Sequence, residues 1–282
     1  MPMHFEDIYF SIFMLILVVL TVGAYFVRAL LVGRARHART DADGGSVLLN
    51  KASMEMGYWL LDPIVRAFVA LHITPNMVTA FSLVPALLAG VAAAFGWFGL
   101  ACVLATAGSL CDLLDGVLAR RMGVASDAGE VFDAAVDRYV EFFFLGGVVV
   151  YYRTHWMVLL LTLAAIFGSL MFSYTTAKGE ALQVTLPRGS MRRAERAVYL
   201  LVAAGLTPFT RAAFDGTPSH ALRELPILFA LSLVAVITNF AVIQRFGALA
   251  AALRARQPQP IQQPPTTDHG IISDRDTPAR SA

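Results

Sequence analysis

The sequence predicts an all-α, polytopic membrane helix bundle, and three observations support that fold class. Of the 282 residues, 57% are hydrophobic and only 15% are charged, with a mean hydropathy of +0.64. Soluble domains carry about 25% charged residues. The apolar residues gather in runs of about 20, the length that crosses a bilayer as a helix. Between these runs, Lys and Arg collect in alternate loops, as positive-inside sorting requires.

The first apolar run, Ile8–Val32, follows an acidic flank that contains Glu6 and Asp7 and precedes a basic one that contains Arg34 and Arg36. A secretory signal has a basic flank first, a shorter apolar core and a small-residue cleavage site. We therefore expect a retained transmembrane helix with its N-terminus outside, rather than a cleaved signal peptide. Residues 1–50 are expected to hold this helix and a polar cytoplasmic linker.

Residues 51–73 form an amphipathic segment, with apolar side chains grouped from Tyr58 to Phe68 and interspersed charges such as Asp62 and Arg66. This pattern predicts a helix that lies in the membrane interface. A short buried helix of a soluble type is the alternative. Pro63 is expected to kink the segment or split it in two.

Six further apolar runs make up an expected six-span domain over residues 74–248. In order they are Asn76–Phe95, Phe98–Arg120, Val131–Tyr151, Trp156–Ala177, Arg196–Thr210 and Pro226–Phe246. Residues 249–282 are expected to form a disordered cytoplasmic tail, an expectation that rests on the Pro, Gln, Thr and Asp content from Gln257 onward. An extra N-terminal helix, an interfacial helix and six core spans thus complete the predicted architecture.

The distribution of basic residues predicts the orientation of the bundle. Threading seven spans from an outside N-terminus leaves only Arg153, Arg211 and Arg223 in the loops of one side. The other side receives the larger set: Arg34, Arg36, Arg39, Lys51, Arg120, Arg121, Lys178, Arg188, Arg192, Arg193, Arg196, Arg245, Arg254 and Arg256. Cytoplasmic loops carry the excess of Lys and Arg. We expect a multi-pass protein of the cell inner membrane.

The chemically informative stretch runs from Asp112 to Asp137. Asp112 and Asp115 are three residues apart, and Asp133 and Asp137 are four apart. Both spacings place side chains on one face of a helix. The first pair ends one apolar run and the second begins the next, so a helical hairpin would bring four carboxylates together near the cytoplasmic surface.

Four carboxylates at membrane depth repel one another and are costly unless they are paired or bind metal. Mg²⁺ and Mn²⁺ prefer such oxygen ligands, and two divalent ions can clamp a pyrophosphate and its attacking and leaving oxygens. Two other interpretations remain open from these residues alone. The carboxylates can form a structural hydrogen-bonding site, or they can belong to a metal or proton transporter.

The complete spacing is Asp112-x-x-Asp115-Gly116-x-x-Ala119-Arg120, then eight residues to Gly129, then x-x-x-Asp133-x-x-x-Asp137. It resembles, with no departure, the signature of the CDP-alcohol phosphotransferase family. The resemblance covers roughly Leu71 to Phe246. It implies a metal-dependent enzyme that transfers a phosphatidyl-type group from CDP-diacylglycerol, or a related CDP-lipid, to an alcohol acceptor and releases CMP.

The resemblance also implies roles for individual residues. Asp112, Asp115 and Asp133 would bind the metals, and Asp137 would be the general base and a further metal ligand. Cytidine nucleotide binding is implied for four residues of the same motif: Gly116, Ala119, Arg120 and Gly129. The small residues among them also have a physical rationale, because they let a backbone or a flat ligand approach closely.

The acceptor is suggested by a weaker resemblance to phosphatidylinositol-phosphate synthases. Ser173 to Ala181, followed by Arg192-Arg193-Ala194-Glu195-Arg196, is similar to a region that holds the phosphate of inositol phosphate in that group. Lys178 and Arg196 are the implied ligands, with Arg138 as a third. Lys178 replaces an Arg of the pattern and Ala194 replaces a Pro. Inositol phosphate, glycerol phosphate and unphosphorylated alcohols therefore remain open.

Other chemistries lack support in the sequence. The two cysteines, Cys102 and Cys111, share one apolar run and imply no disulfide framework, and no Gly-rich P-loop occurs. A conduction route is disfavoured because only Glu141 continues the polar path beyond Asp137, before the apolar Val148–Val150. We expect CDP-linked lipid, an alcohol or alcohol phosphate, membrane lipids and a second copy of the chain as partners, and no nucleic acid.

Overall fold

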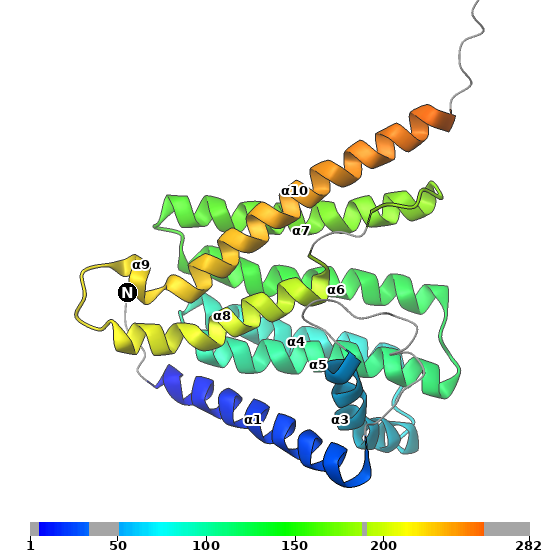
Figure 1. Ribbon diagram of the computed structural model, residues 1–282, viewed down its shortest axis with the longest axis horizontal. Helices are drawn as coiled ribbons and strands as arrows, with labels where there is room; N and C mark the ends of the chain where they lie inside the picture. Colours follow the sequence, from blue (N-terminus) through cyan, green and yellow to red (C-terminus); the bar gives the residue numbers. More distant parts are fainter. Residues whose placement is uncertain (1–5, 34–50, 188–190, 257–282) are drawn as a thin grey trace, which may run out of the picture.

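The computed structural model describes residues 6–33, 51–187 and 191–256, and every regular element among them is an α-helix. This confirms the predicted fold class. The long helices run side by side in one bundle, α9 lies at one end of it and α3 near the other (Figure 1). The elements are α1 (Asp7–Val32), α3 (Lys51–Ala70), α4 (Pro75–Ala94), α5 (Phe98–Met122), α6 (Asp127–Tyr151), α7 (Trp156–Ala181), α8 (Arg193–Ala213), α9 (His220–Arg223) and α10 (Leu225–Arg256).

Five helices are long and apolar enough to cross a membrane, namely α1, α4, α5, α7 and α10. Each of the seven predicted spans corresponds to a long helix, but α6 and α8 are more highly charged than the other five. Their charged side chains, such as Asp137 and Arg196, lie partly or fully inside the bundle. The chain is therefore a multi-pass membrane protein, and its two most polar long helices turn several of their charged side chains toward the inside of the bundle.

Two expectations about helix limits need correction. Pro63 does not split α3, which continues to Ala70, so the segment forms one helix and not two. Helix α10 continues to Arg256, so residues 249–256 are not part of a disordered tail. This segment consists of strong helix formers, and the Arg256 guanidinium donates hydrogen bonds of 2.6 and 2.7 Å to the carbonyls of Leu182 and Gln183. The predicted linker at 34–50 and the tail from 257 lie outside the described residues.

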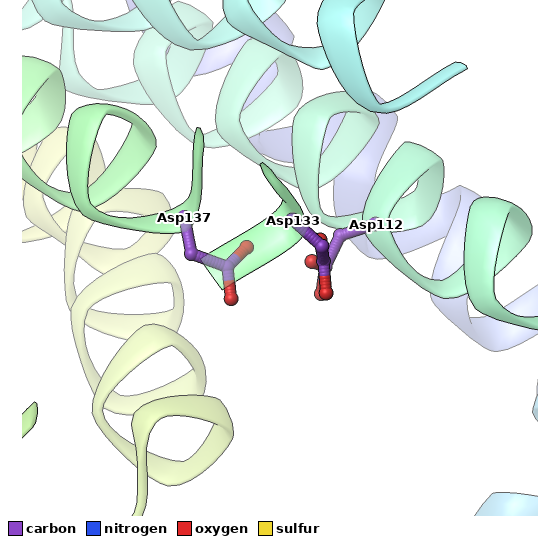
Figure 2. A group of neighbouring side chains, drawn as sticks. All are labelled: Asp112, Asp133 and Asp137. Atoms are coloured by element: carbon purple, nitrogen blue, oxygen red, sulfur yellow. The ribbon is translucent and has the colours of Figure 1, made fainter. Parts of the chain in front are cut away.

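A tight connection joins α5 to α6. Gly123 ends α5 in the left-handed conformation with φ of 68°, which glycine adopts without steric cost. Ser126 then caps α6 by accepting a hydrogen bond of 3.2 Å from the Gly129 backbone amide. The two helices therefore form the predicted hairpin. It brings Asp112 of α5 near Asp133 and Asp137 of α6 (Figure 2).

Helix α4 packs against both arms of this hairpin, and glycine permits its close approach to α6. A Cβ atom at Gly147 would overlap the backbone carbonyl of Gly90, and one at Gly90 would overlap the carbonyl of Phe143. Such small-residue contacts let helix backbones meet directly in membrane bundles. The position of α6, and with it the position of its aspartates, depends on this contact.

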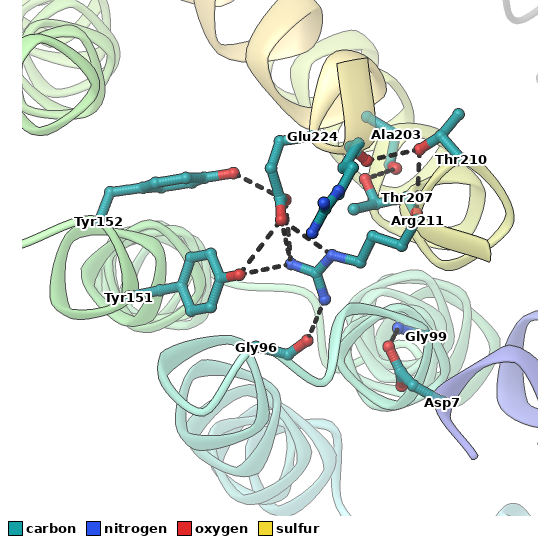
Figure 3. A network of polar contacts seen from close by, with 11 residues as sticks. Asp7, Gly96, Gly99, Tyr151, Tyr152, Ala203, Thr207, Thr210, Arg211 and Glu224 are labelled. Atoms are coloured by element: carbon teal, nitrogen blue, oxygen red, sulfur yellow. Dashed lines mark hydrogen bonds and ion pairs between the residues drawn. The ribbon is translucent and has the colours of Figure 1, made fainter. Parts of the chain in front are cut away.

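A buried ion pair organises the end of the bundle that carries α9. The Arg211 guanidinium donates two hydrogen bonds of 2.9 Å to the Glu224 carboxylate and one of 2.6 Å to the Gly96 carbonyl (Figure 3). The Tyr152 hydroxyl donates to Glu224 at 3.0 Å, and the Tyr151 hydroxyl accepts from Arg211 at 2.8 Å. One network thus joins the α4–α5 turn, the end of α6, helix α8 and the junction between α9 and α10.

Helix α1 attaches to the rest of the bundle at both of its ends. The buried Asp7 carboxylate accepts hydrogen bonds from the backbone amides of Gly99 and Leu100 at 2.8 and 2.9 Å. It therefore caps the positive end of α5 from a different helix. At the other end of α1, the Tyr25 hydroxyl donates to Glu55 of α3 at 3.3 Å.

Helix α3 is tied to the last turn of α5. Asp62 accepts a hydrogen bond of 2.6 Å from Arg121 and also pairs with Arg66. These bonds from Arg121 and Arg66 hold the pKa of Asp62 below its ordinary value, so its carboxylate is ionised at neutral pH. The apolar face of α3 contributes Leu61 and Val65, which pack against Leu118 of α5. The predicted amphipathic segment thus covers α5 next to the carboxylate motif.

Replacing Gly147 by Ala is expected to lower the stability of the protein by about 1–3 kcal/mol, because the added methyl meets the Gly90 backbone. Gly146→Ala is the matched control, since its Cβ would meet only the Phe142 ring at 3.9 Å. Thermal unfolding of both variants in one detergent measures the difference. Equal unfolding temperatures for the two variants would contradict the close contact.

Replacing Arg211 by Met is expected to destabilise the protein by about 3–5 kcal/mol, because it leaves the Glu224 carboxylate buried without its cation. The double replacement Arg211→Met with Glu224→Leu removes both charges and should lose less than the single one. The same thermal measurement compares the two. A double variant less stable than Arg211→Met would show that the ion pair is not the main contribution.

Candidate active site

Three of the four predicted aspartates converge in the structure. Asp112 of α5 and Asp133 and Asp137 of α6 each offer a carboxylate oxygen, and these oxygens lie within 4.8 Å of one another (Figure 2). All three side chains are half-buried. Like charges at this separation repel strongly where water is scarce. The cluster is therefore stable only with cations close to it.

The cluster has the donor set that a hard divalent ion requires. Carboxylate oxygens are the ligands that Mg²⁺ and Mn²⁺ prefer. The Oδ1 atom of Asp133 is buried and has no hydrogen-bond partner in the part of the chain that the structure describes, although buried polar atoms in folded proteins are nearly always paired. A bound cation would satisfy this oxygen. The residues present thus fit a divalent metal.

Arg193, the first residue of α8, lies against this cluster. Its Nη1 atom donates to both oxygens of Asp112, at 3.1 and 3.3 Å, and forms an ion pair with Asp137. The sequence analysis did not single out Arg193 for this role. The only signal was its place in the basic run Arg192–Arg196, where positive charge is also expected for topological reasons.

Asp115 is placed differently from the other three aspartates. Its side chain is 4% exposed, and Oδ2 accepts a hydrogen bond of 2.5 Å from the Thr79 hydroxyl of α4. Asp115 is therefore not a member of the cluster of Asp112, Asp133 and Asp137. It lies about one helical turn after Asp112 on α5. Thr79, which no sequence pattern indicated, holds its orientation.

A cavity of about 780 Å³ adjoins the aspartates, between the start of α4, the end of α5 and the start of α6. Asp115 and Asp133 contribute to its wall. The four residues implied in nucleotide binding all line it as well: Gly116, Ala119, Arg120 and Gly129. The Arg120 side chain lies over Gly116, because a Cβ there would be 3.3 Å from Arg120 Nη1. The structure thus gathers these four residues around one space that opens beside the carboxylates.

The three candidate acceptor ligands lie in different surroundings. Arg196 is fully buried, and its guanidinium donates to both oxygens of Glu141 at 2.9 and 3.1 Å. Arg138 is half-buried and donates to the Ala134 carbonyl of its own helix. Lys178 is exposed in the last turn of α7. Of the three, Lys178 offers its charge most directly to a solute.

A second cavity, of about 430 Å³, lies next to Lys178 in the chain. It is lined by Gly179, Glu180 and the buried Arg245 of α10. Arg245 donates to neutral groups, among them the Thr176 hydroxyl at 2.7 Å. The sequence analysis assigned Arg245 only to the basic side of the membrane, because a single Arg at the end of an apolar run is ordinary.

Comparisons with known proteins agree with this geometry. The family model described as CDP-alcohol phosphatidyltransferase matches residues 72–238. The phosphatidylinositol phosphate synthase of Cutibacterium acnes is 32% identical over 198 residues, which is 68% of this chain and 93% of that protein. The protein of the same description from Streptomyces avermitilis is 28% identical, over 76% of this chain and 89% of its own length.

The solved structures resemble this one in fold. The phosphatidylinositol phosphate synthase of Mycobacterium tuberculosis with CDP-DAG bound superposes with a TM-score of 0.59 at 24% identity, covering 71% of this chain and 98% of that one. Its complex with manganese and citrate gives a TM-score of 0.58 at 24% identity, over 67% and 88% of the two chains. Together with the match of the family model over more than half of the sequence, these findings show that the chain belongs to the CDP-alcohol phosphatidyltransferase family.

Proposed function

We propose that this membrane transferase moves a phosphatidyl group from CDP-diacylglycerol to the hydroxyl of a phosphorylated polyol, inositol phosphate, and releases CMP. The observation that carries the proposal is the convergence of three aspartate oxygens within 4.8 Å beside a cavity of about 780 Å³ lined by the rest of the motif. The named relatives, which are phosphatidylinositol phosphate synthases, support the choice of acceptor.

Two divalent ions, Mg²⁺ or Mn²⁺, would be held by Asp112, Asp115, Asp133 and Asp137. Such ions, when bound, neutralise the charge that builds up on the phosphate oxygens and the leaving CMP. Asp133 supports this assignment through its unpartnered buried oxygen. Asp115 is fixed by Thr79 at the boundary between the cluster and the cavity, where it can serve both metal and nucleotide.

Asp137 is the proposed general base. Asp133 lines the cavity, and Asp137 lies one helical turn further along α6, outside the cavity wall. Its carboxylate can accept the proton of the acceptor hydroxyl as that oxygen attacks the lipid-side phosphorus. The phosphorus–oxygen bond to CMP then breaks, and CMP leaves with the electron pair.

The cavity would hold the cytidine nucleotide. Its wall has no large side chains at Gly116, Ala119 and Gly129, which leaves space for the ligand. The Arg120 guanidinium can pair with a phosphate oxygen. For the acceptor phosphate, Lys178 is the favoured ligand because it is exposed. Arg196 is buried and Arg138 is half-buried, so they are the weaker candidates. Arg245 in the adjoining cavity supplies a further positive charge.

The proposed reaction also agrees with an orientation of the bundle in the membrane. With the basic loops in the cytoplasm, the aspartate end of the bundle faces the cytoplasm of an inner membrane, where water-soluble substrates are made. The protein is proposed to form a homodimer. The exposed apolar side chains of α6, among them Val131, Phe132 and Phe142, offer a surface for a second copy.

Asp137→Asn is expected to lower phosphatidyl transfer by about 100-fold or more, because a positioned base contributes about 10²–10⁴ to such reactions. Membranes containing the protein are supplied with radiolabelled CDP-diacylglycerol, Mg²⁺ or Mn²⁺ and inositol phosphate, and CMP release is measured. Removal of the metal with EDTA should abolish the wild-type activity. Asp215→Asn, an exposed carboxylate beyond α8, is the control and should retain full activity.

The proposal fails if well-folded wild-type protein releases no CMP with any alcohol, or if Asp137→Asn remains as active as the control. Glycerol phosphate, inositol and serine are tested beside inositol phosphate in the same assay. A preference for one of them would keep the transferase reaction but replace the proposed acceptor.

Lys178→Gln is expected to raise the KM for inositol phosphate about tenfold or more and to change kcat little, because hydrogen bonds to charged groups contribute about 1.5–3 kcal/mol. Arg254→Gln, an exposed cation near the end of α10, is the matched control. Steady-state kinetics over a range of acceptor concentrations measures both values. An unchanged KM in Lys178→Gln would show that this lysine does not hold the acceptor phosphate.

A further inference from the structure

Arg193 lies where a metal ion would otherwise balance the carboxylate charge. One guanidinium nitrogen, Nη1, contacts Asp112 at 3.1 Å and also pairs with Asp137. The two aspartates come from different helices, and Arg193 from a third. A single guanidinium nitrogen therefore joins Asp112 to Asp137, whereas Asp133 Oδ1 has no hydrogen-bond partner among the described residues.

The main chain of Arg193 is fixed while its side chain has room to move. The preceding residue, Arg192, donates its backbone amide to Glu195 at 2.9 Å, which caps the start of α8, and Met191 is buried. The Arg193 side chain retains 33% of its exposure. Its long stem can thus change rotamer without disturbing the helix.

A second position for the guanidinium lies beside the first. A cavity of about 60 Å³ between α4, α5, α6 and α8 is lined by Arg193, Ser109 and Glu141. Glu141 already accepts two hydrogen bonds from Arg196 and carries further acceptor capacity on its two oxygens. A guanidinium that leaves the aspartates can therefore remain partnered at Glu141.

We propose that Arg193 is the resident counter-cation of the metal-free site. It holds Asp112 and Asp137 together before metal binds, leaves them for the Glu141 side when divalent cations arrive, and so sets the metal affinity of the enzyme. The inference rests on the proposed function, since it takes the aspartates as the metal ligands. Arg193 is in this sense a positioning residue that acts through Asp112 and Asp137.

Two physical consequences follow. Metal binding must break the Arg193 pairs, so removal of the guanidinium should strengthen metal binding by about tenfold or more, as expected for a unit charge a few ångströms away in a partly solvated site. Without metal, the same removal leaves carboxylates facing one another with no cation, so the protein should unfold at a lower temperature.

The experiment compares wild type, Arg193→Met, Arg193→Lys and Arg192→Gln, all in detergent. Binding of Mn²⁺ is followed by the loss of the free-ion electron paramagnetic resonance signal, and thermal unfolding is measured in EDTA and in Mn²⁺. Arg193→Met should bind Mn²⁺ about tenfold more tightly and unfold earlier than wild type in EDTA, with the gap closing in Mn²⁺. Arg193→Lys, which keeps the charge, and Arg192→Gln, which alters an exposed neighbour, should stay near wild type.

A measurement on the wild type alone covers the case in which Arg193→Met does not fold. Phenylglyoxal modification of arginines is quantified by mass spectrometry in EDTA and in Mn²⁺. The rate at Arg193 should fall on Mn²⁺ binding, because the guanidinium moves from its partly exposed position at the aspartates into the cavity beside Glu141, while the rate at Arg192 stays constant. A rate at Arg193 that is unchanged or higher in Mn²⁺ would overturn the inference.

The outcomes separate this inference from the function on which it rests. If Arg193→Met binds Mn²⁺ as wild type does, while Asp112→Asn loses binding, the aspartates hold metal but Arg193 does not compete with it. If neither wild type nor Arg193→Met binds Mn²⁺, both the inference and the proposed metal site are wrong.

Discussion

Carboxylates that repel one another inside an apolar bundle are the constraint from which much of this structure follows. Asp112, Asp133 and Asp137 present oxygens within 4.8 Å of one another, an arrangement that membrane helices sustain only with cations nearby. The chain supplies one such cation itself, Arg193, and fixes the fourth motif aspartate with a hydroxyl from α4. Helices α5, α6 and α8 each contribute a charged group to this cluster, and α4 contributes the Thr79 hydroxyl that orients Asp115 beside it.

The two ends of the bundle differ in how completely their polar groups are paired. At the end of α9, the Arg211–Glu224 pair and two tyrosines make a closed polar network, in which each charge has its partner within the protein. At the aspartate end, charges are incompletely paired, and a cavity of about 780 Å³ opens between three helices. A saturated network stabilises one arrangement, whereas unsatisfied groups beside open space can bind ligands. The difference between the ends therefore separates a stabilising polar network from the candidate active site.

Helices that precede the matched family region hold α5 in place. Helix α1 lies before residue 72, where the family match begins, yet its Asp7 caps α5 and its Tyr25 contacts α3. Helix α3 in turn binds the end of α5 through Asp62 and Arg121. Both ends of α5, the helix that carries Asp112 and Asp115, are thus held by elements that precede the matched family region.

The sequence by itself determined the fold class, the long helices and the motif that identifies the family. These features depend on local information, because a span needs a run of apolar residues and the carboxylate motif lies within 26 consecutive positions, 112–137. Helix limits were less well predicted. Helix formers extend α10 to Arg256, and α3 runs through Pro63, since tertiary contacts can outweigh local breakers.

Only the tertiary structure decided which groups meet. Thr79 and Asp115 are 36 positions apart, and Arg193 and Asp112 are 81 apart. Nothing in local spacing distinguishes these partners from other threonines and arginines of the chain. The same holds for Arg196, whose charge suggested a ligand site but which packing buries against Glu141. Local sequence determines where helices form, whereas contacts between distant helices select the partner of each buried charge, because a charge buried without a partner is costly.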